Sequence, residues 1–114
     1  AIGFGPDGVT YKIRFHPKVV GDLQIIAEIV ADYSGFSVAK NKLDETQRAV
    51  FGLADTPKKG PIRNELGVAV RAIPAGRKGV VVFEVDDSTT TVFVLAITYG
   101  GADWISKFEE RKKN

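Results

Sequence analysis

The sequence predicts an α+β domain in which a twisted sheet is covered on one face by two antiparallel helices. Two patterns lead to this fold class. A strand with alternating apolar and polar residues comes first, and two stretches with helical spacing of apolar residues follow it. Three more strand patterns then occur, joined by short turns and followed by a short final helix. A helical hairpin packed against such a sheet gives a two-layer architecture around one core.

The first predicted element is a strand that follows a loose, glycine-rich arm over residues 1–9. In the strand, Tyr11, Ile13 and Phe15 alternate with polar side chains, which is the period of a half-buried strand. A chain of 114 residues favours one domain, and we place it over residues 10–114.

Two helices are predicted next, and their connection is so short that they form an antiparallel hairpin. The first begins at Pro17, where proline sacrifices no helical hydrogen bond, and ends at Ser34-Gly35. Its expected apolar stripe consists of Leu23, Ile26, Ala27, Val30 and Tyr33. The second helix spans about residues 37–54, with an inner face formed by Ala39, Leu43, Val50 and Leu53.

Three strands follow, predicted at residues 66–73, 79–86 and 90–99. Turns at residues 74–76 and 87–88 join them into an antiparallel meander. Both faces of the last strand are apolar, which indicates a central strand or a sheet covered on both sides. A short helix is predicted over residues 102–113, with Asp103 favouring its N-terminus. Three aromatic side chains are expected in the core, namely Tyr33, Phe51 and Trp104.

Positive charge is concentrated in one segment, although the net charge of the chain is only +2. Six cationic residues between Pro57 and Lys78 face a single anion, Glu65. Such a basic field attracts phosphates or an acidic protein partner, and it is equally compatible with an ordinary solvated loop. The six residues are Lys58, Lys59, Arg63, Arg71, Arg77 and Lys78.

Several kinds of site are excluded by composition and spacing. The absence of cysteine excludes disulfides and cysteine-based zinc sites. His16 is the one histidine and no carboxylates cluster at ligand spacing, so neither a metal nor a cofactor is expected. The glycines of residues 3–8 follow no strand and precede no helix, which argues against a dinucleotide site. No membrane span or signal peptide is visible either.

The order of elements and several motifs resemble the RelE/ParE superfamily of bacterial type II toxins. The resemblance spans residues 10–105 and includes YKIRFHP before the first helix and LADTPKKGPI after the second. It continues through VVVFEVDD and VFVLAITYGGADW in the last two strands. Toxins of this superfamily are neutralised by a cognate antitoxin, so the resemblance implies a cytoplasmic protein with an antitoxin as its partner.

The resemblance leaves two activities open. RelE-like members cut mRNA on the ribosome, with basic residues on the phosphate and a Tyr, His or Glu for proton transfer. ParE-like members inhibit DNA gyrase and lack that nuclease set. Positions that often carry Tyr, Arg or His in the superfamily, or are otherwise basic, are occupied here by Phe83, Glu84, Ala96, Tyr99 and Ala102. Because phosphoryl transfer requires positive charge around the phosphorane, these replacements favour inhibition by binding.

The leading hypothesis is therefore a ParE-like toxin that binds DNA gyrase, with phosphate or target contacts assigned to Arg63, Arg71, Arg77 and Lys78. The alternative is a metal-independent mRNA endoribonuclease acting on the ribosome, with catalytic residues among Arg71, Arg77, Lys78, Glu84 and Tyr99. A degenerate interaction module with neither activity is the third possibility. The antitoxin is expected on an apolar sheet face, unless the final helix covers it, formed by Val80, Val82, Val92, Val94 and Ala96.

Glu84 is the most unusual residue of the three predicted strands. In a regular strand Phe83 points toward the helical hairpin and Glu84 to the opposite face. We expect Glu84 to pair there with Arg71 of the neighbouring strand, and a role as general base is the alternative. The adjacent carboxylates Asp86 and Asp87 point to opposite faces, so a turn role is predicted for them.

Overall fold

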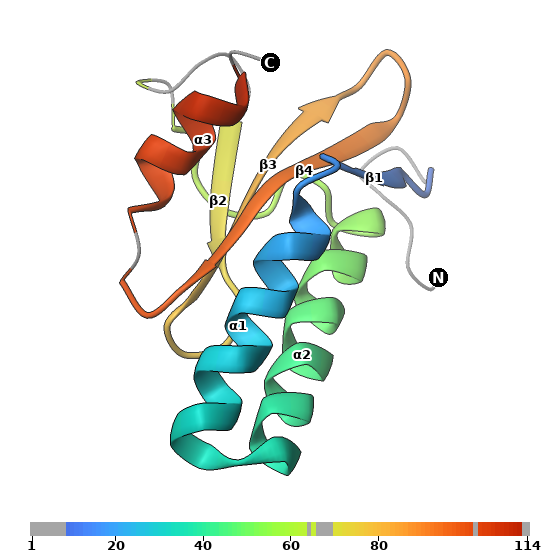
Figure 1. Ribbon diagram of the computed structural model, residues 1–114. Coiled ribbons are helices and arrows are strands. Elements are labelled where there is room, and N and C mark those ends of the chain that lie inside the picture. The colour runs from blue at the N-terminus through green and yellow to red at the C-terminus, as the bar shows by residue number, and fades with distance from the viewer. Residues whose placement is uncertain (1–8, 64, 66–69, 102, 113–114) are drawn as a thin grey trace.

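The computed structural model describes residues 9–63, 65, 70–101 and 103–112, and this part of the chain has the predicted α+β architecture (Figure 1). Residues 1–8 of the predicted arm and residues 66–69 of the strand predicted at 66–73 lie outside the described residues. None of the helices in the described ranges has the length and hydropathy that a membrane crossing requires. The elements are β1 (Lys12–Phe15), α1 (Val19–Ser34), α2 (Phe36–Phe51), the 3-10 turn η1 (Gly52–Ala54), β2 (Val70–Pro74), β3 (Gly79–Asp86), β4 (Thr91–Tyr99) and α3 (Trp104–Lys112).

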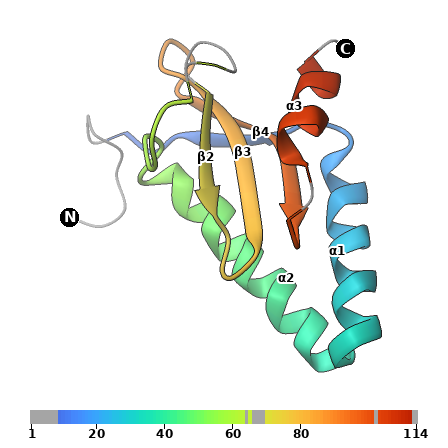
Figure 2. The same cartoon turned by 90° about the vertical axis from the view of Figure 1, so that its left-hand side faces the viewer.

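The four strands form one mixed sheet in the order β1-β4-β3-β2. β2, β3 and β4 make the predicted antiparallel meander. β1 pairs in parallel with β4, from Lys12 opposite Thr91 to Phe15 opposite Val94. Parallel pairing requires a long crossover connection, and the helical hairpin of α1 and α2 lies within it. The hairpin packs on one face of this sheet and α3 on the other (Figures 1 and 2).

The main core lies between the helical hairpin and the sheet. Phe83 is fully buried there, as predicted from strand alternation. Gly35 ends α1 with a φ of +91°, a left-handed conformation that favours glycine, and its N–H bonds the Ala31 carbonyl. The helices contribute buried residues that largely match the predicted stripes, namely Val19, Ile26, Val30, Ala39 and Val50.

Two aromatic residues that were expected in the core lie on the surface instead. Tyr33 is 89% exposed and Phe51 is 54% exposed. Figures 1 and 2 show that the closed end of the hairpin extends beyond the sheet, so the last turn of α1 has no layer to cover it. Phe51, in the last turn of α2, makes an edge-on contact with the ring of Phe15, with 6.1 Å between ring centres.

A second, smaller core lies under α3. Phe108 is 1% exposed, and Trp104, which was expected to be buried, is partly buried beside it. Asp103 caps the helix, because its carboxylate accepts hydrogen bonds from the N–H and hydroxyl of Ser106 at 3.1 and 2.7 Å. The sheet residues that complete this core are Val70, Val82, Leu95 and Ala96.

A bulge interrupts the alternation of β4. Two consecutive residues of β3 pair with Ala96 and Val94, which leaves Leu95 as an extra residue. Leu95 and Ala96 therefore both face α3, while Ile97 returns to the hairpin side with Val94. The prediction that Val92 and Val94 share a face with Ala96 is therefore wrong, because the bulge lies between them.

The turn between β3 and β4 is built by the two adjacent carboxylates, as predicted. Asp86 accepts hydrogen bonds from the backbone N–H and the hydroxyl of Ser88. Asp87 accepts one from the Tyr11 hydroxyl and one from the Lys58 ammonium, each at 2.7 Å. The turn is thus fastened both to the start of β1 and to the basic loop.

Candidate functional site

Arg71, predicted to contact phosphate, is bound to the protein's own backbone. Its guanidinium donates hydrogen bonds to the carbonyl oxygens of Lys58, at 3.0 Å, and of Gly60. Gly60 approaches β2 so closely that a Cβ atom would lie 2.7 Å from the side chain of Ile73. Arg71 therefore holds the basic loop against the edge of the sheet.

Arg77, Lys78 and Tyr99 lie together at one end of the sheet. Arg77 and Lys78 belong to the β2–β3 turn, and the next residue of β3 pairs with Tyr99. Lys42 of α2 joins them, because its ammonium lies 5.3 Å from the centre of the Tyr99 ring and donates to the Arg77 carbonyl at 2.9 Å. Arg71 lies three residues before the end of β2, about 10 Å along the strand from this group.

Arg63 makes contacts on the α3 side of the sheet. Its guanidinium lies 5.0 Å from the centre of the Trp104 ring and pairs with Glu65 at 2.7 Å. The backbone N–H of Arg63 donates to the carbonyl of Val70, the residue before Arg71. The guanidinium groups of Arg63 and Arg71 nevertheless have different partners. The four predicted phosphate-binding side chains therefore occupy three different places.

Glu84 faces the α3 side, as predicted, but its predicted partner is wrong. Its carboxylate pairs with the ammonium of Lys112 in α3 at 2.8 Å. The strand register places Val70 opposite Glu84 and Arg71 opposite Phe83, whose side chain is buried under the hairpin. Adjacent strand residues point to opposite faces, so Arg71 and Glu84 lie on different sides of the sheet.

The five residues predicted to bind the antitoxin do not share one face. Val92 and Val94 lie under the helical hairpin, whereas Val82 and Ala96 lie under α3. All four are 0% exposed. Val80 is partly buried on the α3 side. A partner reaches the buried four only if the helix that covers them moves.

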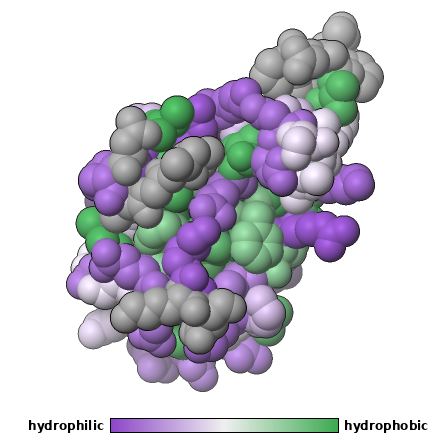
Figure 3. All heavy atoms as spheres, turned by 90° about the horizontal axis from the view of Figure 1, so that it is seen from above, coloured by the Kyte–Doolittle hydropathy of each residue, from purple (hydrophilic) through white to green (hydrophobic). Residues whose placement is uncertain are grey.

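A groove of about 760 Å³ lies on the α3 side of the sheet, next to the β3–β4 turn. Two rows of paired residues across β1, β4 and β3 build it. Cations of β1 stand on one wall and carboxylates of β3 on the other, with an aromatic ring between them. Figure 3, which looks down on the molecule, shows hydrophobic surface between hydrophilic side chains. We call this the charged groove, and its two rows are Arg14–Phe93–Glu84 and Lys12–Thr91–Asp86.

The two cations of the charged groove are available to a ligand. Glu84 is paired with Lys112 and Asp86 with Ser88. Within the described residues, neither Lys12 nor Arg14 forms an ion pair. The β1 wall is therefore the more attractive one for an anionic group.

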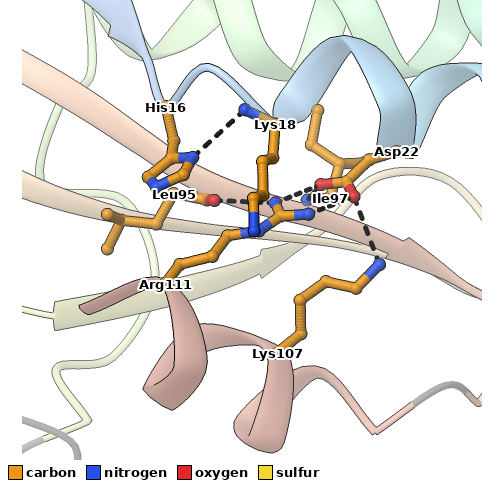
Figure 4. A network of polar contacts seen from close by, with 7 residues as sticks. All are labelled: His16, Lys18, Asp22, Leu95, Ile97, Lys107 and Arg111. Carbon is orange, nitrogen blue, oxygen red and sulfur yellow. Dashed lines mark hydrogen bonds and ion pairs between the residues drawn. The ribbon is translucent and has the colours of Figure 1, made fainter. Parts of the chain in front are cut away.

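A buried ion pair joins α1 to α3 (Figure 4). The Asp22 carboxylate, 1% exposed, accepts two hydrogen bonds of 2.6 Å from the guanidinium of Arg111, which is 8% exposed. Lys107 donates a third bond at 3.2 Å from the rim. This bidentate geometry is the strong arrangement for an arginine and a carboxylate.

The same ion pair also satisfies the backbone of β4 beyond the end of β1. The Ile97 N–H donates to Asp22 at 2.9 Å, and Arg111 donates to the Leu95 carbonyl at 2.9 Å. These backbone groups lie at the bulge, beyond Val94, which is the last residue of β4 that pairs with β1. One pair of side chains thus fastens two helices to the irregular part of the sheet (Figure 4).

The protonation of Asp22 follows from these contacts. Burial alone would raise the pKa of Asp22, but hydrogen bonds from Arg111, from the Ile97 N–H and from Lys107 outweigh it and hold the pKa below its ordinary value. Burial lowers the pKa of His16, and the nearby charges of Arg111 and Lys18 lower it further. Asp22 is therefore an anion and Arg111 its counter-ion, which suits a structural clamp.

His16 has a local role at the start of α1. Its Nδ1 accepts a hydrogen bond from the Lys18 N–H at 3.1 Å, and its backbone N–H donates to the Val94 carbonyl at 2.8 Å. Among the described residues, no three His, Asp or Glu side chains are grouped so that they could hold a metal ion.

Sequence reasoning missed Asp22, Lys42 and Arg111. Asp22 precedes Ile26 and Val30 by four and eight residues, so it stands on the buried stripe of α1. Arg111 likewise follows the buried Phe108 by three residues in α3. A charged residue at core spacing was the available signal, and it identifies a buried charge but not its partner.

One known protein family matches most of the chain. The family described as "ParE toxin of type II toxin-antitoxin system, parDE" matches residues 13–104. Comparison with curated protein sequences gives no significant match.

Solved structures show the same fold in toxin–antitoxin proteins. A chain of the chromosomal ParDE system from P. aeruginosa has a TM-score of 0.67 at 19% identity, covering 79% of this chain and 96% of its own. A chain of the RelBE2 complex from Mycobacterium tuberculosis has a TM-score of 0.60 at 23% identity, covering 81% and 93%. A mutant of the E. coli toxin RelE in the free state has a TM-score of 0.56 at 18% identity, covering 90% and 98%.

Proposed function

Because the chain belongs to the ParE toxin family of type II toxin–antitoxin systems, we propose that it inhibits DNA gyrase by binding and is neutralised by a cognate antitoxin. The family match covers β1 through the start of α3 and therefore all four strands. The similar folds of ParDE and RelE toxins leave gyrase inhibition and mRNA cleavage as the two candidate activities.

The observation that carries the choice is that the candidate nuclease residues are only partly brought together, since Tyr99 lies with Arg77 and Lys78 but Glu84 and Arg71 do not join them. In the strand register Glu84 lies opposite Phe93, and Tyr99 lies opposite Gly79. The two alternative proton-transfer groups are therefore five residues apart along β3, about 16 Å, and only Tyr99 is near Arg77 and Lys78. Proton transfer and phosphate stabilisation must act on the same reacting atoms. Arg71, which would stabilise the phosphate, is bound to loop carbonyls instead.

The charged groove supports binding to a protein surface. Its two cations would attract an anionic segment, but the carboxylates on the opposite wall would repel a phosphorane. Phe93 offers an apolar contact between the walls. A groove with both charges and an aromatic floor suits a protein partner that presents a matching pattern of charges.

The antitoxin would use part of the apolar surface proposed from the sequence. Val80, Val82 and Ala96 lie on the α3 side, so an antitoxin segment that replaces α3 would cover them. Val92 and Val94 belong to the main core and are not accessible by that route. The Asp22–Arg111 pair is then the contact that the antitoxin must break.

Expression without the antitoxin tests the proposed target. We expect growth inhibition with filamentation and induction of the DNA-damage response, because a poisoned gyrase leaves broken DNA. Prompt loss of protein synthesis with cleaved mRNA would instead identify a ribosome-dependent nuclease. Normal growth at confirmed soluble expression would identify a degenerate interaction module.

A pair of variants tests the charged groove. Lys12→Ala combined with Arg14→Ala should weaken binding to purified gyrase and flatten its dependence on salt concentration. Lys59→Ala, which removes an exposed cation from the basic loop, is the control and should bind as the unmodified protein does. Equal affinity of all three proteins would exclude the charged groove as the target-binding surface.

A further inference from the structure

The outer edge of β1 carries backbone groups that are open to a partner. β1 is the end strand of the sheet and pairs only with β4 among the described strands (Figure 1). The N–H groups of Lys12 and His16 donate to carbonyls on the β4 side, at 2.9 and 2.8 Å. Alternate residues of a strand bond to the same neighbour, so the N–H and C=O groups of Ile13 and Phe15 point the other way. Within the described part of the chain, these outward groups have no hydrogen-bond partner.

The open stretch is short, because the turn after α2 covers the beginning of the edge. The N–H of Tyr11 donates to the carbonyl of Ala54 in η1 at 2.9 Å. At the other end, α1 begins at Val19, four residues after the last residue of β1. An added strand would therefore bond to Ile13 and Phe15, through a segment of about three residues.

The two faces of the sheet beside this edge differ in character. Lys12 and Arg14, the two cations of the charged groove, stand on the α3 face, and within the described ranges neither forms an ion pair. On the hairpin face, Phe15 is 42% exposed and its ring meets the 54% exposed Phe51 edge-on. A strand that alternates carboxylate and apolar side chains matches both faces, because its own side chains alternate between them.

Neither a second copy nor the chain's own N-terminus has this pattern. Antiparallel pairing of β1 with β1 of another copy would keep the α3 faces on one side of the joined sheet. Lys12 and Arg14 of the two copies would then oppose one another, and like charges on short edge strands resist such self-pairing. Residues 1–8 contain one carboxylate, and half of them are glycine or proline, a composition that disfavours a strand.

We propose, on the basis of the function proposed above, that DNA gyrase adds an extended acidic segment to this edge and lengthens the sheet by one strand. Lys12 and Arg14 belong both to the charged groove and to the edge strand, so one partner engages both. The charged groove then receives the carboxylates of that segment. The antitoxin is expected elsewhere, because the core under α3 lies on β2, β3 and β4.

The alternation of β1 determines how the added segment lies. In an antiparallel pair, the residue opposite Arg14 occupies a non-hydrogen-bonded position, where the Cα atoms are only about 4.5 Å apart. A carboxylate there reaches the guanidinium of Arg14 on the α3 face. The residues before and after it exchange hydrogen bonds with Ile13 and Phe15, and their apolar side chains lie against the rings of Phe15 and Phe51.

Hydrogen–deuterium exchange of the full chain, with and without purified DNA gyrase, tests the added strand. The amides of Ile13 and Phe15 should exchange about tenfold more slowly in the complex, because they acquire hydrogen bonds to the partner. The amides of Lys12 and His16 are the internal control. They are already bonded on the β4 side in the free protein, so their exchange should change much less.

Two substitutions of Phe15 separate the backbone from the side chain. Phe15→Pro removes the outward N–H and leaves the bonds to β4, since proline is tolerated at an edge position whose N–H faces solvent. Phe15→Ala is the matched control, because it removes the same ring and keeps the N–H. With folding of both variants checked by circular dichroism, Phe15→Pro should bind gyrase about tenfold more weakly than Phe15→Ala. If Phe15→Pro does not fold, the exchange measurement decides alone.

The outcomes separate this edge from the wider proposal. Gyrase that binds without slowing the amides of Ile13 and Phe15 would overturn the added strand and leave the proposed function standing, whereas gyrase that does not bind at all would overturn both. Slowed exchange with the co-expressed antitoxin but not with gyrase would overturn it by assigning the edge to the antitoxin. Equal binding of Phe15→Pro and Phe15→Ala would overturn it as well, and would leave the two cations only the role of preventing self-pairing.

Discussion

Asp22 and Arg111 form a buried, bidentate ion pair, with 2.6 Å between each guanidinium nitrogen and its carboxylate oxygen, although the residues lie 89 positions apart in the sequence. Asp22 comes from the first turn of α1 and Arg111 from the last turn of α3. Between them lie the Leu95 carbonyl and the Ile97 N–H of the β4 bulge, and each is bonded to one member of the pair. The pair therefore determines where α3 lies on the sheet.

Removing one member of this pair should destabilise the protein strongly. We expect Asp22→Asn to lower the free energy of unfolding by about 3–5 kcal/mol, because Arg111 is left as a buried charge without a counter-ion. Urea unfolding followed by circular dichroism measures the effect. The double variant with Arg111→Met removes both charges and should recover a large part of the loss; a double variant as unstable as the single one would contradict this explanation.

The pH dependence of stability should also depend on Asp22. Its pKa is lowered in the folded protein below the ordinary value of 3.8, so its contribution is fully present above 3.8 and is lost as the pH falls through the lower folded value. His16 acts in the same direction from a higher pH, because its folded pKa lies below 6.5 and the unfolded chain takes up the proton first. Unfolding curves between about pH 7 and pH 3 should therefore show the Asp22→Asn variant losing less stability below 3.8 than the unmodified protein. Parallel losses in the two proteins would remove Asp22 from the explanation.

Arg71 should act on stability more than on target binding. Arg71→Ala removes two hydrogen bonds to loop carbonyls and should lower the free energy of unfolding by about 1–3 kcal/mol. Arg77→Ala should change stability little, because only the backbone carbonyl of Arg77 has a partner among the described residues. Thermal unfolding of both variants makes the comparison. If Arg71→Ala were as stable as the unmodified protein and bound its target less well, the original assignment of Arg71 to phosphate would be restored.

Glu84 should prove dispensable for activity. Glu84→Gln breaks a partly exposed ion pair with Lys112, so we expect a loss of only about 0.2–1 kcal/mol of stability and unchanged growth inhibition. Lys112→Gln is the matched control and should have the same small effect. Loss of toxicity in Glu84→Gln alone, at unchanged stability, would show that the carboxylate itself takes part in the chemistry.

The elements that follow from local spacing were predictable, and those that depend on long-range contacts were not. β3 was predicted at its observed bounds, and Phe83 was placed correctly under the hairpin, because both follow from alternation within the strand. The bulge at Leu95 could not be predicted from the sequence pattern, because both faces of this strand are apolar. It placed Val92 and Val94 on the hairpin side, although they were expected on the same face as Val82 and Ala96.

The candidate site was less predictable for the same reason. The sequence placed Arg71 in a basic segment but did not show what its guanidinium binds. Its partners are loop carbonyls, and their positions depend on the path of the loop through Gly60. Glu84 was assigned to the correct face, yet its partner Lys112 comes from a helix 28 residues further along the chain. The predicted pairing of Arg71 with Glu84 failed because neighbouring strands were compared without their register.

A gyrase assay with the purified protein tests the central claim most directly, with heat-unfolded protein as the control. Relaxed plasmid, DNA gyrase and ATP are incubated with the protein, and supercoiled and cleaved DNA are measured. In parallel, the integrity of an mRNA is followed on translating ribosomes. We predict loss of supercoiling and accumulation of gyrase-cleaved DNA while the mRNA stays intact. Unimpaired supercoiling together with cleavage of the mRNA would contradict the assignment.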